Sequence, residues 1–326
     1  MDYIVLDLEW NQSPGGKEDS VAHLPFEILE IGAVRLNERF CQTGEFHRLI
    51  RPRVYPQLHY KISEITHMDM KELKQRGQDF KQAAEEFIAW CGKEYVFFTW
   101  GAMDLTELQR NMDYYHVPIP FPRPVLYYDV QKLYSLQCGD GTLRQSLDQV
   151  VQEQNLDCGR PFHRALDDAY YTGRILAGMD FEQARPYLSV DYYRLPGEPG
   201  EELYLHFPNY SKFVSRVFPT KEEALKDKVV TDMLCPFCNR MLSKKIRWFS
   251  YGQRLCYGLA DCPEHGLVRG KLRVRKSEYG GTYVIKTMKR ATEEEAALIL
   301  ERREEGRKKR NTRNHLKSVK KRQRGR

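Results

Sequence analysis

Short apolar runs alternate with segments of helical periodicity through the first 180 residues, and this order most constrains the fold. Five strands are predicted, at residues 3–10, 27–36, 45–52, 95–100 and 124–130. Four helices are predicted, at residues 80–91, 105–112, 143–151 and 165–176. Thr142 is the expected cap of the third helix. The sequence therefore predicts an α/β domain in which helices flank a mixed sheet.

The composition of the chain changes after about Asp180, so we place a domain boundary there. The segment LPGEPGEE is rich in Pro, Gly and acid and predicts a turn or linker. A chain of 326 residues commonly forms one large domain with a smaller module. We predict an α/β domain, then a linker with an aromatic and basic extension of unassigned fold, then a cysteine-rich module, and finally a charged helix with a basic, disordered tail. These occupy residues 1–180, 181–230, 231–276 and 277–326.

Positive charge is concentrated in the tail. Residues 301–326 hold 13 of the 52 Lys and Arg residues but 3 of the 45 Asp and Glu residues. The rest of the chain is therefore slightly acidic, and the tail is the part expected to follow a phosphate backbone. The chain is 41% hydrophobic and 30% charged, which argues against disorder throughout and against a membrane span. Because the start MDYIVLDLEWN does not resemble a secretory signal, we expect a cytoplasmic location.

Carboxylates interrupt the apolar pattern of the first domain. Asp7 and Glu9 lie two residues apart in a predicted strand, so both side chains leave one face. Two carboxylates there repel each other and lose solvation, so we expect a cation between them, the alternative being a wet face of an edge strand. Asp104 follows the strand at 95–100 and opens the next helix, where aspartate is also a common cap.

The segment PFHRALDDAYYTGRI adds a histidine and two further carboxylates, His163, Asp167 and Asp168. His163 and Asp168 are five residues apart, which on a helix turns them away from each other by about 140°. They can act together if His163 lies in the turn before the helix and Asp168 projects from its first turns. The segment alone leaves open whether Asp167 or Asp168 is the functional residue.

These three segments resemble the motifs of the DEDDh exonucleases, which include polymerase proofreading subunits, RNase T and oligoribonuclease. That family has an Asp-x-Glu, a mid-domain Asp and a His-x-Ala-x-x-Asp-Ala segment, and VLDLEW, WGAMDLTEL and HRALDDA match them in order. EIGAVRL and ISEITHM resemble the family's second strand and the loop after its third, although His67 stands where glycine is common. The resemblance covers residues 1 to about 180 and is nearest to the KapD-like and histone-mRNA-degrading branches.

The resemblance implies an RNase H-like fold and a set of catalytic residues. These are Asp7, Glu9, Asp104, His163 and Asp168. The four carboxylates form a hard oxygen site suited to two Mg²⁺ or Mn²⁺ ions. His163 is expected to deprotonate the attacking water. Trp10, Trp100 and Phe162 flank the acidic positions and are candidates either for stacking on bases or for core packing.

The eight cysteines fall into two groups. Cys41, Cys91, Cys138 and Cys158 are scattered and are expected to be free thiols. The others cluster, and Cys235-x-x-Cys238 with Cys262-x-x-His265 has the spacing of two zinc half-sites. We expect one structural zinc ion held by these four residues, with Cys256 as the alternative to His265.

Basic and aromatic residues alternate between and after the zinc half-sites, in SKKIRWFSYGQRLCYG and GKLRVRK. Trp248, Phe249, Tyr251 and Tyr257 are candidates for stacking on bases or for packing in a small sheet. The sequence as a whole predicts a metal-dependent 3′-to-5′ exonuclease acting on single-stranded nucleic acid, with RNA favoured over DNA. One alternative is a non-catalytic nucleic-acid-binding protein, against which the five matching polar positions argue. The other is an exonuclease that proofreads DNA or trims oligonucleotides.

Overall fold

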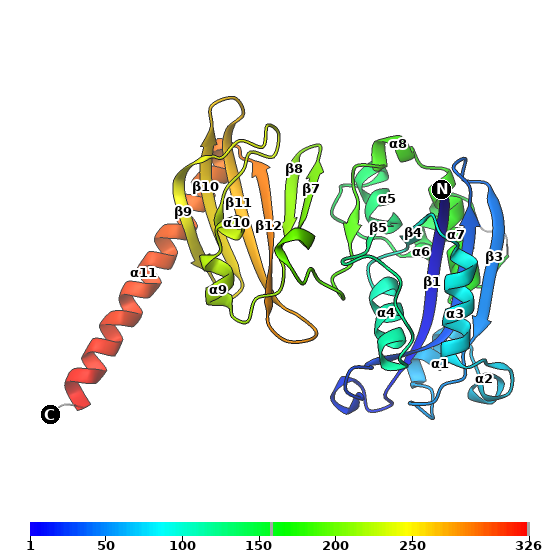
Figure 1. The fold of residues 1–326 in the computed structure, drawn as a ribbon. Helices are drawn as coiled ribbons and strands as arrows, with labels where there is room; N and C mark the ends of the chain where they lie inside the picture. Colours follow the sequence, from blue (N-terminus) through cyan, green and yellow to red (C-terminus); the bar gives the residue numbers. More distant parts are fainter. Residues whose placement is uncertain (157–158, 325–326) are drawn as a thin grey trace. The chain divides into compact units, whose positions relative to one another are not determined.

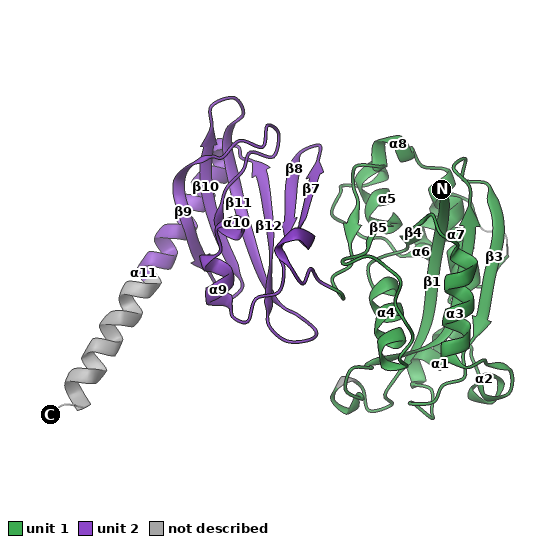
Figure 2. Ribbon diagram, viewed as in Figure 1, with its two compact units in different colours: residues 1–194 green, residues 195–326 purple. Residues whose placement is uncertain are grey.

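A six-stranded mixed sheet forms the centre of residues 1–194, the first of two units of the chain (Figures 1 and 2). The computed structural model describes residues 1–156 and 159–324, without the side chains of Lys17 and of residues 309–324. Cys158, predicted to be a free thiol, lies outside the described residues. The strands are β1 (Asp2–Gln12), β2 (Phe26–Leu36), β3 (Gln42–Leu49), β4 (Tyr95–Thr99), β5 (Leu126–Asp129) and β6 (Ser189–Val190).

The strand order in this sheet is β3-β2-β1-β4-β5-β6. β1 is antiparallel to β2 and parallel to β4, so the predicted mixed sheet with flanking helices is confirmed. Val5 lies opposite Phe98 near the end of β4, so Asp7 and Glu9 project from β1 beyond the point where its neighbour stops. The first unit extends past the expected boundary near Asp180, because β6 pairs with β5.

Helices cover both faces of the sheet. They are α1 (Tyr60–Thr66), α2 (Met70–Arg76), α3 (Phe80–Cys91), α4 (Asp104–Tyr114), α5 (Val130–Cys138), α6 (Leu147–Glu153), α7 (Ala165–Ala177) and α8 (Phe181–Ala184), with a 3-10 turn at Lys17–Asp19. Leu6 and Leu8 of β1 pack in one core with α3 and α4. Tyr3 and Val5 point to the opposite face and pack in a second core with α5, α6 and α7. β1 is therefore buried on both sides, and Asp7 and Glu9 continue the face that meets α7.

Local details differ from the sequence prediction at two helices. The segment ISEITHM, expected to be a loop, contributes to α1, which ends at His67 in the left-handed conformation (φ 53°). α6 begins at Leu147 behind a capping box at Ser146, so the predicted cap at Thr142 is wrong. The N–H group of Thr142 instead donates a hydrogen bond of 2.7 Å to the side chain of Asp140.

A second six-stranded sheet organises residues 195–326, in the order β7-β8-β12-β11-β10-β9 with all neighbours antiparallel. Its strands are β7 (Leu203–Phe207), β8 (Tyr210–Val214), β9 (Ser243–Tyr251), β10 (Leu255–Cys262), β11 (Gly266–Lys276) and β12 (Thr282–Arg290). The remaining elements are a 3-10 turn (Pro199–Glu201), α9 (Lys221–Lys226), α10 (Lys228–Thr231) and α11 (Glu293–Arg324). The expected cysteine-rich module, residues 231–276, is thus built into a larger sheet to which the unassigned extension contributes two strands.

Trp248 belongs to the core of this second unit. Its ring packs against β10 and β11, where a Cβ atom on Gly270 would lie 2.3 Å from the indole. Its Nε1 donates a hydrogen bond of 2.7 Å to the carbonyl oxygen of Thr231. Tyr257 is also buried, in a cluster with the start of α11. For these two aromatic residues the structure supports core packing.

The helix α11 continues into the segment that we expected to be a disordered tail. Side chains beyond residue 308 lie outside the described residues, so contact between the tail and nucleic acid stays a prediction. Among the described residues, no helix combines the length and the apolar character needed to cross a bilayer.

Candidate active site and metal centre

Four carboxylates line one pocket of the first unit, which has a volume of about 360 Å³. Asp7 and Glu9 come from β1, Asp104 is the first residue of α4, and Asp168 lies in the first turn of α7. Elements that are distant in the sequence therefore bring together the acidic residues that the motifs single out.

A glycine in β2 lets α7 approach the sheet beside these carboxylates. Gly32 lies opposite Asp7, and a Cβ atom on Gly32 would be 2.1 Å from the backbone carbon of Ala165. No side chain fits at that distance without displacing the helix. The register of β1 and β2 also shifts between Glu9 and Trp10, and such irregularities re-aim side chains near functional sites.

A buried ion pair fixes the turn that precedes α7. Arg164 is the N-cap residue of α7, and its Nη2 atom donates to Glu30 Oε1 at 3.0 Å. Glu30 lies opposite Glu9 on β2 and also bonds to His47. Burial would raise the pKa of Glu30, but its hydrogen bonds to His47 and Arg164 lower that pKa. Glu30 was not predicted from the sequence, although a carboxylate inside the apolar run EILEIGAVRL was a visible signal.

His163 and Asp168 meet as the sequence requires, with the histidine in the turn before the helix. His163 has a φ of 63°, and its backbone N–H donates to Asp168 Oδ2 at 3.1 Å. Ligand atoms of Glu9, His163 and Asp168 all lie within 4.8 Å of one another. The other oxygen of Asp168, Oδ1, is buried and has no hydrogen-bond partner among the described residues. It is therefore available to a cation.

The sequence left two alternatives open, namely that Asp167 is the functional residue in place of Asp168 and that Asp104 is a helix cap. The surroundings of the two residues support neither alternative. Asp167 forms an ion pair with Arg160, at 3.1 Å, outside the pocket lining. Met103 occupies the N-cap position of α4, so Asp104 is not the cap of that helix. Asp104 Oδ1 instead accepts a hydrogen bond of 3.2 Å from the backbone N–H of Leu8. This bond ties the start of α4 to β1.

The pocket disfavours four negative charges. Burial, followed by repulsion from Asp104, Asp168 and Glu9, raises the pKa of Asp7 well above its usual range. Burial and the neighbouring carboxylates raise the pKa of Glu9 to about 8. Burial is also the main cause that raises the pKa values of Asp104 and Asp168 to about 7. Bound cations would reverse these shifts, and oxygen ligands alone suit Mg²⁺ or Mn²⁺. The residues present therefore fit the implied metal ions.

The three flanking aromatic residues divide between the pocket and the core. Trp10 and Trp100 line the pocket. Phe162 does not, because its ring stacks on Tyr171 with centroids 5.0 Å apart. Trp10 and Trp100 are therefore placed where they could stack on bases. Phe162 packs in the core, which was the other role considered for it.

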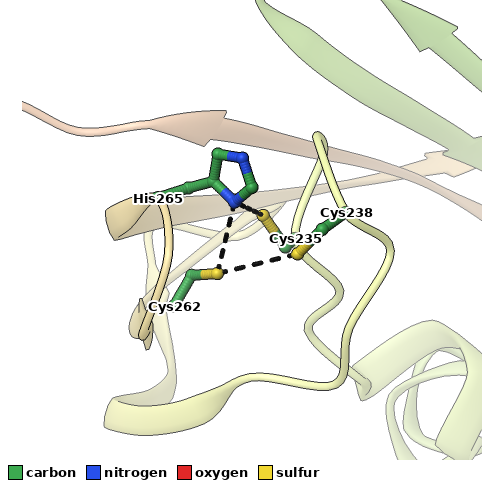
Figure 3. Close-up of side chains that lie close together, drawn as sticks. All are labelled: Cys235, Cys238, Cys262 and His265. Carbon is green, nitrogen blue, oxygen red and sulfur yellow. Dashed lines mark hydrogen bonds between the residues drawn. The ribbon is translucent and has the colours of Figure 1, made fainter.

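The zinc half-sites come together in the second unit, and Figure 3 shows their four side chains turned toward one another. Cys235 and Cys238 lie in the turn before β9, whereas Cys262 and His265 close the hairpin between β10 and β11. Their ligand atoms all lie within 4.8 Å of one another.

The distances within this cluster match tetrahedral zinc. The Sγ atoms of Cys238 and Cys262 are 3.7 Å apart, and Nδ1 of His265 is 3.6 Å from the Sγ atoms of Cys235 and Cys262. Zinc at about 2.3 Å from sulfur and about 2.0 Å from nitrogen places tetrahedral ligands roughly 3.5–3.8 Å apart. Burial would raise the pKa of Cys262, but the hydrogen bond from His265 and nearby backbone N–H groups lower it to about 6. The thiolate form of Cys262, which zinc requires, is thus favoured, whereas burial raises the pKa of Cys235 until a metal ion binds.

Cys256 lies away from this cluster. It is buried in a separate core with Leu272 and Val284, and its Sγ atom is 3.8 Å from Ser250 Oγ. Of the two candidates for fourth ligand, His265 is the one that the structure places with Cys235, Cys238 and Cys262. Cys41, Cys91 and Cys138 are free thiols in the described part of the chain.

Comparisons with known proteins give a family match for the first unit. The exonuclease family RNase_T matches residues 4–176. A protein of Bacillus subtilis (strain 168) named "Probable 3′-5′ exonuclease KapD" is 28% identical over 169 residues, which cover 51% of this chain and 78% of that protein.

Solved structures also overlap with the chain. The nuclease domain of 3′hExo, described as a DEDDh family member bound to rAMP, is 22% identical with a TM-score of 0.47, covering 58% of this chain and 96% of that one. A 3′-exonuclease structure described by recognition of the histone mRNA stem-loop is 19% identical with a TM-score of 0.46, covering 56% and 82%.

Proposed function

This chain belongs to the RNase_T exonuclease family, and we propose that it releases nucleoside 5′-monophosphates one at a time from the 3′ end of single-stranded nucleic acid, with RNA favoured over DNA. The observation that carries the proposal is the single pocket in which Asp7, Glu9, Asp104 and Asp168 meet beside His163. The name of the Bacillus subtilis relative supports the 3′-to-5′ direction. The preference for RNA rests on the resemblance to the histone-mRNA-degrading branch.

The four carboxylates are the groups that would hold two Mg²⁺ or Mn²⁺ ions. When bound, such ions activate a water molecule and stabilise the departing 3′ oxygen. The residues of the chain provide the fixed geometry for this reaction. The bond from Leu8 N–H orients Asp104, and the bond from His163 N–H orients Asp168, each through one carboxylate oxygen.

His163 is the proposed general base. Its imidazole is exposed and has a ligand atom within 4.8 Å of Glu9 and Asp168, so it can take a proton from water at the pocket and release it to solvent. The ion pair between Arg164 and Glu30 holds the adjacent residue in place. We expect His163→Asn, which tolerates the positive φ, to lower kcat by about 10²- to 10⁴-fold while Mn²⁺ binding is retained. An unchanged rate would exclude His163 as the base.

The test of the function is an assay on matched single-stranded RNA and DNA carrying a 5′ label, with Mg²⁺ or Mn²⁺. We expect the 5′-labelled substrate to give a ladder that shortens from the 3′ end, with faster hydrolysis of RNA. A second substrate, labelled at the 3′ end, should release a labelled mononucleotide. Internal cleavage products would contradict exonuclease action. Faster hydrolysis of DNA would favour the proofreading alternative. Tight binding without any shortening under all these conditions would favour the non-catalytic alternative.

We further propose that Cys235, Cys238, Cys262 and His265 hold one structural zinc ion. Metal analysis is expected to find one zinc per chain that survives dialysis against Mg²⁺, because thiolate and imidazole ligands favour zinc over hard cations. Cys238→Ser should lose this zinc, whereas the matched variant Cys256→Ser should keep it, because Cys256 lies in another core. Loss of zinc from both variants, or from neither, would contradict the ligand assignment.

A further inference from the structure

Basic side chains gather on one face of the second sheet. Side chains alternate along β11, so Leu272 and Val274 enter the core while Lys271 and Arg273 lie on the opposite face. The apolar side is closed by residues of α9 and α10, including Ala224 and Val230. The start of α11 packs on the other face over β9 and β10. On the strands of that face that are not in this cluster, Val214 and Ile285 are buried, whereas Arg273 and Lys289 are exposed.

Strand register collects four basic residues on this face, over β8, β11 and β12. Lys271 of β11 is paired with Thr287 of β12, which is paired with Lys212 of β8. Arg273 lies two residues along β11, and Lys289 of β12 lies two residues from Thr287, so both share the face of Lys271. We call this surface, formed by Lys212, Lys271, Arg273 and Lys289, the basic face.

No described residue in the three cross-strand rows that contain the basic face is an Asp or Glu. Glu295 reaches this side from α11, but it forms an ion pair of 3.1 Å with Arg269. Burial and the nearby charge of Arg273 lower the pKa values of Lys212 and Lys271. Like charges on neighbouring strands repel each other and destabilise a sheet. A bound polyanion would reduce this repulsion.

Aromatic rings border the basic face on both sides. On β7 and β8 the rings of Phe207 and Tyr210 stack with centroids 4.3 Å apart, and Lys212 Nζ lies 5.5 Å from the centroid of Phe207. On the other side Arg302 of α11 lies over Tyr257, at 5.0 Å. Phe207 and Tyr257 are themselves buried, so their rings hold the neighbouring cations in place and the basic side chains are the groups left for a ligand.

We propose that the basic face binds the phosphodiester backbone of single-stranded nucleic acid and so adds affinity for substrates longer than the terminal nucleotides. The charge pattern favours a polyanion, and the choice of nucleic acid rests on the proposed function. The residues concerned differ from the aromatic candidates predicted from the sequence, because Trp248 is partly buried and packed in the core and Tyr257 is buried. The basic tail is a separate contribution, since Lys212, Lys271, Arg273 and Lys289 all lie on strands.

The test measures binding of labelled single-stranded RNA and DNA to the full chain carrying Asp168→Asn, so that substrate is not consumed. In this background we compare Lys212→Gln with Lys271→Gln, as a double variant, against Lys226→Gln with Lys228→Gln. The control pair is exposed on α9 and α10, on the other side of the sheet. Each pair removes two charges. We expect the basic-face pair to weaken binding about 10-fold near 100 mM salt and to reduce the slope of log K against log salt by about 1.4.

The proposal is overturned if both pairs weaken binding equally, if neither does, or if polyglutamate displaces the oligonucleotide at equal charge concentration. In the chain with Asp168 restored, the basic-face pair should hydrolyse a dinucleotide at the wild-type rate. A wild-type chain that hydrolyses nothing would refute the proposed function but leave the binding comparison intact. The two failures are therefore distinguishable.

Discussion

Adjacent aspartates in HRALDDA have opposite environments. Asp168 is buried beside Glu9 and His163 and keeps an oxygen without a hydrogen-bond partner among the described residues. Asp167 is neutralised by Arg160. Spacing in the sequence could not separate the two, because consecutive residues in the first turn of a helix have equal access to its start. The choice came from the family resemblance, and the ion pair of Asp167 supplies its physical reason.

We expect Asp168→Asn to lower kcat/KM by at least about 100-fold, because the amide removes a negative charge from the proposed metal site. Asp167→Asn is the matched control and should stay within about 3-fold of wild type, since Asp167 faces Arg160. Rates on a 5′-labelled oligonucleotide, with circular dichroism to check folding, measure both. Inactivity of Asp167→Asn in a folded chain, with an active Asp168→Asn, would reverse the assignment.

The carboxylates should also make the metal-free protein sensitive to pH. Burial and mutual repulsion raise the pKa of Glu9 from 4.5 to about 8 and those of Asp104 and Asp168 from 3.8 to about 7. The folded state then binds more protons than the unfolded state between about pH 4 and 8, so stability falls as pH rises through that window. We expect the Tm of the first unit, without Mg²⁺ or Mn²⁺, to fall by at least about 5 °C from pH 5 to pH 8.

Two comparisons check this pH dependence. Asp7→Asn removes one of the interacting charges and should make the decrease in Tm from pH 5 to pH 8 smaller. Asp19→Asn, at an exposed position, should leave this decrease unchanged. Added Mn²⁺ should restore the Tm at pH 8 by offsetting the repulsion. A wild-type Tm that rises from pH 5 to pH 8 without metal would contradict the burial of these charges.

At the scale of elements, the position of α7 depends on the contact between Gly32 and Ala165. We expect Gly32→Ala to destabilise the first unit by about 1–3 kcal/mol, because its Cβ atom would lie 2.1 Å from the helix backbone. Activity should fall further than stability alone predicts, since α7 and its preceding turn carry Asp168 and His163. Gly44→Ala in β3 is the control, because the nearest atom there is 3.7 Å from the added carbon. Urea unfolding and the nuclease assay measure the two effects, and equal behaviour of both variants would contradict the close-packing argument.

The elements that could be predicted from the sequence are those in which apolar residues recur with a clear helical or strand periodicity. All five strands expected in the first unit are present, and the apolar spacing of residues 80–91 matches α3. α5 was missed because it follows β5 without a break, with Asp129 serving both as the last strand residue and as the helix cap. The second sheet could not be assembled from the sequence, since β8 pairs with β12 from a distant part of the chain. No local pattern specifies such a partner.

In the candidate site, too, contacts between elements that are distant in the sequence could not be predicted. The motifs named the five polar residues, because each keeps a recognisable local spacing. They did not name Glu30, which supports Arg164 from the neighbouring strand. They also left Trp248 open, whose burial depends on Gly258 and Gly270 in two other strands. Supporting contacts of this kind are set by packing between elements, which the order of residues within one motif does not record.

For the whole molecule, the position where the first unit ends determines where the chain can be cut without destabilising that unit. The segment after α8 is tied to α4 by Asp191, whose side chain accepts from Thr106 and, at 2.7 Å, from Gln109. Arg194 donates to the carbonyl oxygen of Ile119 at 3.1 Å. These bonds, with the pairing of β6 and β5, extend the unit to Arg194 and place the working boundary later than composition indicated.

We therefore expect a chain cut after Arg194 to fold and to hydrolyse a dinucleotide at the rate of the full chain, because all five proposed catalytic residues precede the cut. A chain cut after Asp180 should be less stable by at least about 2 kcal/mol, since Gln109 and Thr106 lose their buried partner. Urea unfolding compares the two. Longer substrates should bind the 1–194 chain more weakly and with a shallower salt dependence, because the cut removes the basic face and the 13 basic residues of the tail. If the 1–194 chain folds but fails on the dinucleotide, the second unit must complete the active site, and catalysis cannot be assigned to the first unit alone.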